Sequence, residues 1–215
     1  MEILYSDEQI VIVDKHYGVS SQDGKDGCLP QMLREILGGE IYPVHRLDTQ
    51  TTGLIVYART KESAAFLSKE ILNKEVVKKY LCICHGELSG RGTMSDYLFH
   101  DRLKNKSFVV DTKRRGSKEA LLDYSVLENR DGLNLVEIAL YTGRTHQIRV
   151  QLASRGFALY GDGKYGAKDN DKIALHSFYL SLTHPKTKEK IELYSKPSGK
   201  VWESFEYIKK WDTCR

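Results

Sequence analysis

The stretch from Pro43 to Arg59, PVHRLDTQTTGLIVYAR, sets a polar turn directly against an apolar strand. The polar part contains Asp48 among hydroxyl side chains and one arginine, Gly53 closes it, and residues 54–58 are apolar. A loop that is braced by a buried strand presents a reactive group rigidly, so Asp48 is the candidate catalytic residue. The alternative is that Asp48 and its neighbouring threonines only satisfy the backbone of a turn.

Three further motifs follow along the chain and bear on this choice. Lys79-Tyr80-Leu81 comes first, and it is followed by Thr142–Val150 with Gly161–Gly166, and then by Leu175-His176 with His184-Pro185. In this order and spacing, nearly the whole chain, from about Leu4 to Leu193, resembles the RluA family of RNA pseudouridine synthases.

The resemblance implies an enzyme that isomerises uridine to pseudouridine in RNA without a cofactor. The aspartate of that family falls on Asp48 in His45-Arg46-Leu47-Asp48. The reaction breaks the bond from ribose to the ring nitrogen, rotates the uracil and rejoins it through carbon 5. A carboxylate can serve there as nucleophile or base and as an electrostatic stabiliser, and the sequence leaves these roles open.

Three substrate-binding residues also follow from the resemblance. Arg149 matches the arginine of the His-Gln-Ile-Arg motif, and we expect its guanidinium to keep Asp48 ionised. Tyr80 matches the active-site tyrosine, although a strand tyrosine is more often a core residue. Arg46 matches the arginine that replaces the extruded base, with a simple phosphate contact as the alternative.

Other polar residues of the motifs are assigned to structure. Asp162 lies between glycines, which favours a tight turn, and the loop lacks the context of a nucleotide-binding motif. The histidines at positions 45, 146, 176 and 184 are assigned in the same way. Gln151 stands where the family has a histidine, and we expect this change to alter local RNA contacts.

Length and composition set the broad class. The chain has 215 residues, 40% hydrophobic and 29% charged, which is enough for a proper core. We expect a single catalytic domain over residues 1–215 with no appended N-terminal RNA-binding domain. The N-terminus lacks a secretory pattern and no apolar run is long enough to cross a membrane, which predicts a cytoplasmic protein, and we expect a monomer.

The four cysteines and seven histidines predict no metal site. Cys82 and Cys84 alternate along a strand and point to one face, whereas Cys28 and Cys214 lie far apart in the sequence. Zinc needs four convergent ligands, and no second closely spaced pair exists. We therefore expect buried thiols and no bound metal.

The formal net charge of +4 is too small to indicate RNA binding by itself. The charge is unevenly placed, however, because residues 101–119 carry seven basic side chains against three acidic ones. The alternating run Ser107–Val110 predicts a two-stranded arm beside this cluster, with Lys113, Arg114 and Arg115 at its tip. Such an arm suits a phosphate backbone, although a charge run is usually only a solvated face.

The pattern of elements predicts an α+β fold, with a mostly antiparallel mixed sheet, flanking helices and a central catalytic cleft. Two hairpins are expected early and late, at residues 4–13 and 120–141. Thr60 should cap a helix that ends near Leu72, and a final helix should cover Val201–Trp211.

Two functions from other classes compete with the synthase. A non-catalytic RNA-binding or chaperone protein of the same fold would have no use for Asp48, Tyr80 and Arg149 together. A glycosidase would pair Asp48 with Asp162, but such enzymes need two carboxylates at a defined separation. The principal prediction is a synthase whose partner is structured RNA, ribosomal or transfer RNA.

Overall fold

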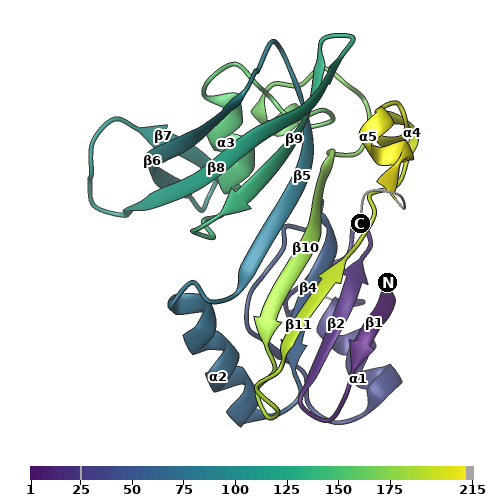
Figure 1. The fold of residues 1–215 in the computed structure, drawn as a ribbon. Coiled ribbons are helices and arrows are strands. Elements are labelled where there is room, and N and C mark those ends of the chain that lie inside the picture. Colours follow the sequence, from purple (N-terminus) through teal and green to yellow (C-terminus); the bar gives the residue numbers. More distant parts are fainter. Residues whose placement is uncertain (25, 212–215) are drawn as a thin grey trace. The chain divides into compact units, whose positions relative to one another are not determined.

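The computed structural model describes residues 1–24 and 26–211, which form two compact units. The first unit comprises Met1–Lys78 and His176–Lys196. The second comprises Lys79–Leu175 and the chain from Pro197 onward. The strands and helices of each unit are described separately, with element labels as in Figure 1.

The first unit is a sheet with helices beside it. Its strands, in spatial order, are β1 (Glu2–Ser6), β2 (Ile10–Lys15), β4 (Thr52–Ala58), β10 (Leu175–Thr183) and β11 (Lys190–Tyr194), and β3 (Tyr42–Pro43) also pairs with β4. The β4–β10 pair is parallel, and the other pairs of this unit are antiparallel. The helices are α1 (Leu29–Leu37) and α2 (Lys61–Leu72).

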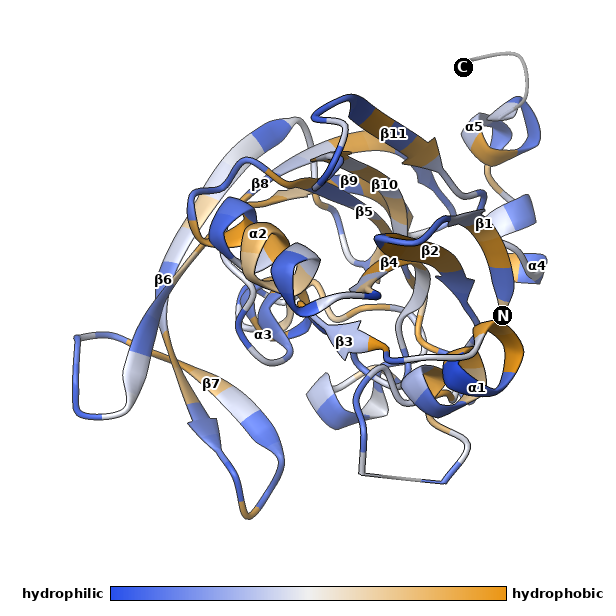
Figure 2. Cartoon of the chain, turned by 90° about the horizontal axis from the view of Figure 1, so that it is seen from below, coloured by the Kyte–Doolittle hydropathy of each residue, from blue (hydrophilic) through white to orange (hydrophobic). Residues whose placement is uncertain are grey.

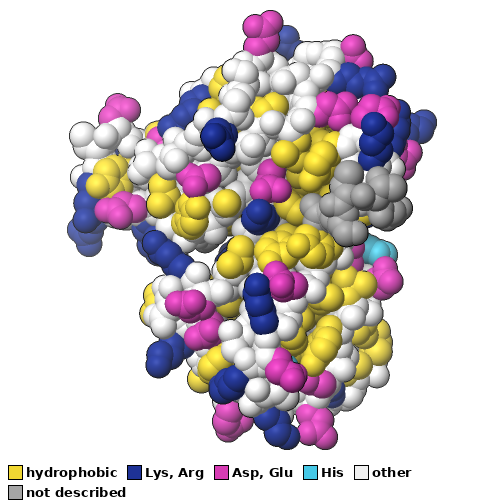
Figure 3. Space-filling model, viewed as in Figure 1, with side chains coloured by type: hydrophobic (Ala, Val, Ile, Leu, Met, Phe, Trp, Pro, Cys, Tyr) yellow, Lys and Arg dark blue, Asp and Glu magenta, His cyan; other side chains and the backbone are white. Residues whose placement is uncertain are grey.

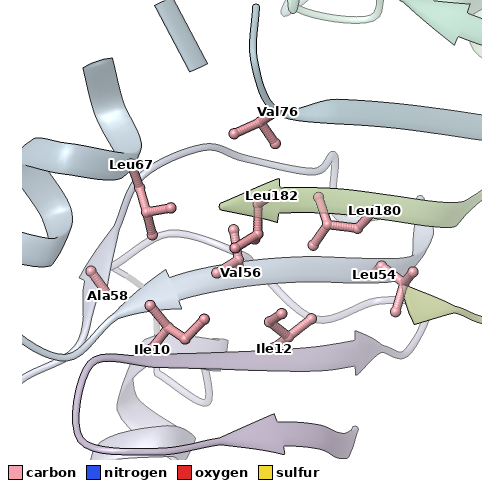
Figure 4. Close-up of a cluster of buried hydrophobic side chains, with 9 residues drawn as sticks. All are labelled: Ile10, Ile12, Leu54, Val56, Ala58, Leu67, Val76, Leu180 and Leu182. Atoms are coloured by element: carbon pink, nitrogen blue, oxygen red, sulfur yellow. The ribbon is translucent and has the colours of Figure 1, made fainter. Parts of the chain in front are cut away.

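A buried apolar cluster joins this sheet to α2. Its members alternate along β2, β4 and β10 and meet Leu67 of the helix (Figure 4). They are Ile10, Ile12, Leu54, Val56, Ala58, Leu67, Val76, Leu180 and Leu182. Each large apolar side chain buried in this way stabilises the fold by about 1.5–3 kcal/mol. In Figure 2, β2 and β4 are correspondingly rich in hydrophobic residues.

The local predictions for this unit are confirmed. The first hairpin forms, with Asp7 Oδ1 accepting hydrogen bonds from the backbone of Gln9 and Ile10 in its turn. Thr60 caps α2, because its side chain accepts a hydrogen bond of 3.1 Å from the Ser63 amide. Residues 30–37 also have the pattern of a short helix stopped by Gly38 and Gly39, and helix α1 ends at Leu37.

The second unit is an antiparallel sheet packed with short helices. The strand order is β5 (Val77–His85), β9 (Leu133–Leu140), β8 (Ser117–Arg130), β6 (Arg91–Asp101) and β7 (Lys106–Val110). Helix α3 (Gln147–Ala153) and the short 3-10 helix η1 (Gly163–Tyr165) pack beside it, and α4 (Lys200–Glu203) and α5 (Glu206–Lys209) follow. The two units together confirm the α+β class with a mixed sheet.

The basic arm has three strands where the sequence predicts two. Strand β6 pairs with β7 on one side, through Tyr97–Asp101, and with the start of β8 on the other. Lys113, Arg114 and Arg115 therefore lie in the β7–β8 loop, whereas the β6–β7 turn is a separate tip at residues 102–105. Strand β8 begins at Ser117, inside the basic region and three residues before the expected start of the late hairpin at residue 120.

The prediction of a single final helix over Val201–Trp211 is also wrong in part. The backbone breaks at Ser204 and Phe205, giving two four-residue helices in place of one. Phe205 is fully buried with extended backbone, and the Glu128 carboxylate accepts hydrogen bonds from the first amides of α5. Tertiary contacts thus outweigh the helical periodicity here. The C-terminal Cys214 lies outside the described residues, and the three other cysteines are buried and free.

Candidate functional site

Asp48 lies in a short turn that leads into the buried strand β4. Its own backbone carbonyl accepts a hydrogen bond of 2.9 Å from the Thr51 amide, which closes the turn. The Asp48 side chain is half-buried, whereas Leu47 before it and Thr51 after it are buried. The turn is therefore anchored on both sides of the aspartate, as the sequence predicts for a rigidly presented group.

A buried lysine supports the turn from β2. Lys15 is fully buried, and its Nζ atom donates hydrogen bonds to the carbonyl oxygens of His16 (3.1 Å), Val19 (3.0 Å) and Thr49 (3.2 Å). Burial lowers the pKa of Lys15 to about 8, against the opposing effect of the Asp48 and Asp14 carboxylates. The ammonium group therefore fixes the residue after Asp48 and attracts the carboxylate itself.

Further contacts hold the backbone on both sides of Asp48. Buried Ser21 donates from Oγ to the Leu47 carbonyl (2.7 Å) and accepts from the Leu47 amide (3.1 Å). The Gly18 amide donates to the Thr49 carbonyl at 2.9 Å. Because these contacts bind the neighbours of Asp48 by their backbone, they fix its position without occupying its side chain.

His45 and Arg46, at the start of the motif, have different environments. His45 accepts a hydrogen bond of 3.2 Å at Nε2 from the Val56 amide, which agrees with its assignment to structure. Burial, with a smaller effect from Lys78, lowers the pKa of His45 to about 3, so the ring is neutral. Arg46 is exposed, so its guanidinium is available to a ligand.

Tyr80 and Arg149 belong to the second unit. Tyr80 lies on β5 opposite Ile138 of β9 and is 5% exposed. Arg149 lies on α3 and is 2% exposed. Arg149 forms a two-pronged ion pair with Asp162, with Nε to Oδ2 at 2.6 Å and Nη2 to Oδ1 at 2.8 Å.

Asp162 has a structural role, as the sequence predicts, and this role includes the ion pair with Arg149 as well as the glycine turn. Asp162 is fully buried, and its carboxylate neutralises Arg149. Gly161 before it has a φ of +78°, and a Cβ atom there would lie 2.3 Å from the Lys172 carbonyl oxygen. Only glycine fits, so the glycine loop serves to seat the carboxylate. The pairing of Arg149 with Asp48 stays a prediction.

Tyr165 connects this ion pair to the basic arm. The Arg149 guanidinium carbon lies 5.2 Å from the centre of the Tyr165 ring. The Tyr165 hydroxyl accepts a hydrogen bond of 2.8 Å from the Ser107 amide at the start of β7, and it lies 3.0 Å from His146 Nδ1. Burial raises the pKa of Tyr165, so the phenol stays protonated.

Gln151 does not lie where it could contact RNA, so that expectation is wrong. The side chain is fully buried, and its Nε2 atom donates to the Asp96 carboxylate (2.6 Å) and to the Met94 carbonyl (3.2 Å). The substitution for histidine therefore acts inside the second unit, where it ties α3 to β6. Its Oε1 atom is buried with no hydrogen-bond partner.

The arm is basic on its exposed surface. Arg102, Lys104, Lys113, Arg114 and Arg115 are all exposed, and Figure 3 shows Lys and Arg side chains at the outer end of the arm. Arg114 stacks on Phe99, with its guanidinium carbon 4.7 Å from the ring centre. This distribution leaves several cations free to meet phosphates.

Two features of the described residues bear on other classes of function. Over residues 1–24 and 26–211, three or more His, Cys, Asp or Glu side chains nowhere come together as metal ligands would. No helix in the same part of the chain has the length and apolar character needed to cross a membrane.

The sequence predicts Asp48, Arg46, Tyr80 and Arg149 as site residues and Asp162 as a structural residue, whereas the supporting roles of Lys15 and Ser21 were not predicted. Lys15, Ser21 and Asp162 are buried polar side chains that contact the motif residues or their neighbours. Lys15 could have been recognised, because alternation along the apolar strand β2 puts it on the same face as Val11 and Val13. Nothing in the sequence signalled Ser21, which lies far from the motif along the chain.

Comparisons with known proteins agree with these motifs. The family model described as RNA pseudouridylate synthase matches residues 9–154. The ribosomal large subunit pseudouridine synthase D of Nitrosomonas europaea is 32% identical, over 86% of this chain and 58% of its own length. The tRNA pseudouridine synthase C of Pasteurella multocida is 30% identical, over 90% of each chain.

A solved structure gives the same fold. The human RNA pseudouridylate synthase domain containing 1 protein superposes with a TM-score of 0.76 at 27% identity, over 92% of this chain and 83% of its own. The family match runs through the motifs around Asp48, Tyr80 and Arg149. The chain therefore belongs to the RNA pseudouridine synthases, of the RluA type, and is an isomerase that modifies RNA.

Proposed function

We propose that this synthase isomerises specific uridines in ribosomal or transfer RNA, with Asp48 as its catalytic residue and without a cofactor. The observation that carries the proposal is the way the Asp48 turn is held. Lys15 and Ser21 bind the backbone of Thr49 and Leu47, the two neighbours of the aspartate. A carboxylate whose neighbours are fixed and whose side chain is half-buried is suited to reach a reacting sugar.

The proposed chemistry is a rearrangement that balances without an added reactant. The bond between ribose C1′ and uracil N1 breaks, and a bond between C1′ and C5 forms after the base rotates. The proton on C5 is lost, and N1 gains one. Asp48 can attack the sugar or remove a ribose proton, and in either role its negative charge stabilises the positive charge that develops on ribose.

The other motif residues have proposed roles in binding the substrate. The target uridine must leave the RNA stack before it reaches a carboxylate, so the reaction needs base flipping. Exposed Arg46 is free to enter the vacated space. Tyr80 offers a ring for stacking on uracil, and Arg149 offers a guanidinium already oriented by Asp162.

We treat both units as parts of one catalytic domain. The family match at residues 9–154 runs across the boundary between Lys78 and Lys79, so the family resemblance does not separate them. The names of the two curated relatives, one ribosomal and one for transfer RNA, support a structured RNA as partner. We further propose that the protein acts on this RNA as a monomer in the cytoplasm.

Two alternatives give different outcomes. A non-catalytic RNA-binding or chaperone protein of this fold would bind RNA but leave its uridines unchanged. A glycosidase would use Asp162 as the second carboxylate, but this residue is fully buried and committed to Arg149. The ion pair removes the acid or base that a glycosidase would need.

Pseudouridine mapping tests the proposal. RNA from cells that lack this protein is compared with RNA from cells that express the parent chain or Asp48→Asn. We expect one or a few sites to disappear without the protein, to return with the parent and to stay absent with the variant. Sites that return with Asp48→Asn would refute the catalytic role of Asp48, and an unchanged map in all three would favour the non-catalytic alternative.

A further inference from the structure

A chain of buried and half-buried polar groups lies beside the Asp48 turn and is used by none of the roles above. It begins at Thr52, the first residue of β4, whose Oγ1 atom lies 2.7 Å from Nδ1 of His176. His176 lies directly opposite Thr52 in the parallel β4–β10 pair. The imidazole is 3% exposed, and Thr52 is half-buried.

The far side of the imidazole contacts Ser195, just after β11. His176 Nε2 lies 3.1 Å from the Ser195 carbonyl oxygen and 3.0 Å from its Oγ atom. The Ser195 hydroxyl donates to the Asp14 carboxylate on β2. Because a carbonyl oxygen only accepts and the hydroxyl proton is directed to Asp14, His176 Nε2 must carry the hydrogen.

The proton position at Nε2 determines the contact at Nδ1. Burial lowers the pKa of His176 to about 4, even though the Asp14 carboxylate acts to raise it, so the ring is neutral near pH 7. A neutral ring with hydrogen on Nε2 presents a lone pair at Nδ1. Thr52 therefore donates its hydroxyl proton to His176, and the orientation of that hydroxyl is fixed.

The backbone beside this contact has no freedom to shift. Gly53 has a φ of +100°, and a Cβ atom there would lie 2.3 Å from the Ser177 carbonyl oxygen. The start of β4 is thus in direct backbone contact with β10, one residue from the Thr52–His176 pair. Thr51 is the residue immediately before Thr52, and its backbone amide closes the Asp48 turn.

We propose that His176 is a positioning residue for Asp48, acting through the Thr52 hydroxyl to fix the start of β4 and hence the turn that carries the aspartate. Ser195 and Asp14 hold the imidazole in the tautomer that accepts from Thr52. His176 itself does not touch the substrate in this role. The inference rests on the proposed catalytic role of Asp48.

The test measures single-turnover rate at saturating RNA for matched substitutions at both ends of the contact. Thr52→Val removes the hydroxyl at constant shape, and Thr52→Ser keeps it. We expect the first to lower the rate tenfold or more and the second to stay within about threefold, because small displacements of a reacting group are costly. The RNA dissociation constant should change less than twofold in both.

Two substitutions of His176 separate the two ring nitrogens. The side-chain oxygen of His176→Asn can replace Nδ1 and accept from Thr52, whereas the amide of His176→Gln reaches toward Ser195 instead. We expect His176→Asn to retain several-fold more rate than His176→Gln. The double variant of Thr52→Val with His176→Gln should be no slower than the slower single variant, because both remove the same contact.

His184→Asn is the matched control for loss of a buried histidine. His184 is also 3% exposed in the first unit, but its Nε2 bonds to Asp7 at 2.8 Å in the first hairpin. We expect this control to lower the melting temperature and leave the rate of the folded enzyme within twofold. An equal loss of rate in the control would show that general destabilisation explains the result and would overturn the positioning role.

Asp48→Asn in the same assay separates the two proposals. If Asp48→Asn is inactive while folded Thr52→Val keeps the parent rate, the positioning role of His176 is wrong and the catalytic role stands. If Asp48→Asn still isomerises uridine, the proposed catalytic role of Asp48 is wrong, and the inference about His176 is wrong with it. Rate losses for Thr52→Val and His176→Gln that multiply in the double variant would also overturn the inference.

Discussion

The Nζ atom of Lys15 lies 3.2 Å from the carbonyl oxygen of Thr49, the residue that follows Asp48. A fully buried ammonium group thus joins β2 to the turn that carries the candidate catalytic carboxylate. The contact couples the protonation of a lysine to the position of an aspartate. It predicts that the reaction rate falls as pH rises and that the contribution of Lys15 to the free energy of unfolding rises.

The single-turnover rate should fall as pH rises through about 8, the pKa to which burial lowers Lys15. Loss of the proton removes one of three donated hydrogen bonds and the attraction to Asp48. Lys15→Met should be slower at every pH and lack this alkaline limb. The measurement is the rate between pH 6.5 and about 9.5 at saturating RNA, the range set by that lowered pKa and the ordinary lysine value near 10.4.

The stability contribution of Lys15 should change in the opposite direction. Its pKa is about 8 in the folded state and roughly 10.4 in the unfolded chain, so the unfolded chain binds more protons between these values. The free energy of unfolding of the parent, relative to Lys15→Met, should therefore rise with pH in that window. A relative stability that is flat or falls with pH would contradict the lowered pKa.

Arg149→Ala should destabilise the protein by about 3–5 kcal/mol, because it leaves the buried Asp162 carboxylate unpaired. Arg149→Lys should restore only part of this loss, since an ammonium group cannot make the two-pronged contact. The double variant of Arg149→Met with Asp162→Leu should be more stable than Arg149→Ala, and it should be inactive. The measurement is denaturant unfolding of each variant.

The choice between Asp48 and Asp162 as partner of Arg149 follows from a double-mutant cycle. Arg149→Ala combined with Asp162→Ala should destabilise by less than the sum of the single changes, because the two residues share one interaction. The same cycle with Asp48→Ala measures the pairing that the sequence predicts. Additive losses in the Asp48 cycle would show that this second pairing contributes nothing to stability.

Asp48→Asn should bind RNA with nearly the parent affinity and show no isomerisation. Binding depends on phosphates and stacking, whereas the chemistry depends on the carboxylate charge. Filter binding and pseudouridine detection on the same purified RNA measure the two properties. Measurable turnover by the purified variant would exclude Asp48 as the catalytic residue.

Replacement of Lys113, Arg114 and Arg115 by alanine should weaken RNA binding and leave the rate at saturating RNA near the parent value. The three side chains are exposed in the β7–β8 loop, whereas the Arg149–Asp162 pair is buried. The slope of log affinity against log salt should shrink by about 2–3, at roughly 0.7–0.9 per lost phosphate contact.

A matched control removes three exposed lysines of the first unit, at positions 61, 69 and 186. These carry the same charge, so a general electrostatic effect would weaken binding equally in both triple variants. An unchanged salt slope in the loop variant would show that the basic loop is only a solvated face. The RNA path would then be sought around Lys74, Lys78 and Lys79.

Local sequence signals determined much of the fold. Turn and capping residues placed the first hairpin and α2, because Asp7 and Thr60 act on amides two or three residues away. The apolar run at residues 54–58 predicted a buried strand, and β4 is buried along the whole of this run. The prediction of one continuous final helix is wrong for a tertiary reason. Burial of Phe205 breaks a segment whose periodicity is helical.

The motifs determined the candidate site residues, but only the tertiary structure decided what holds them. Asp48 and Arg149 are recognisable because each lies in a long contiguous motif. Their supports come from elsewhere in the chain, as Lys15 lies more than thirty positions before Thr49 and His176 lies 124 positions after Thr52. Such partners depend on strand order and register, which arise when the sheet forms and leave no local pattern in the sequence.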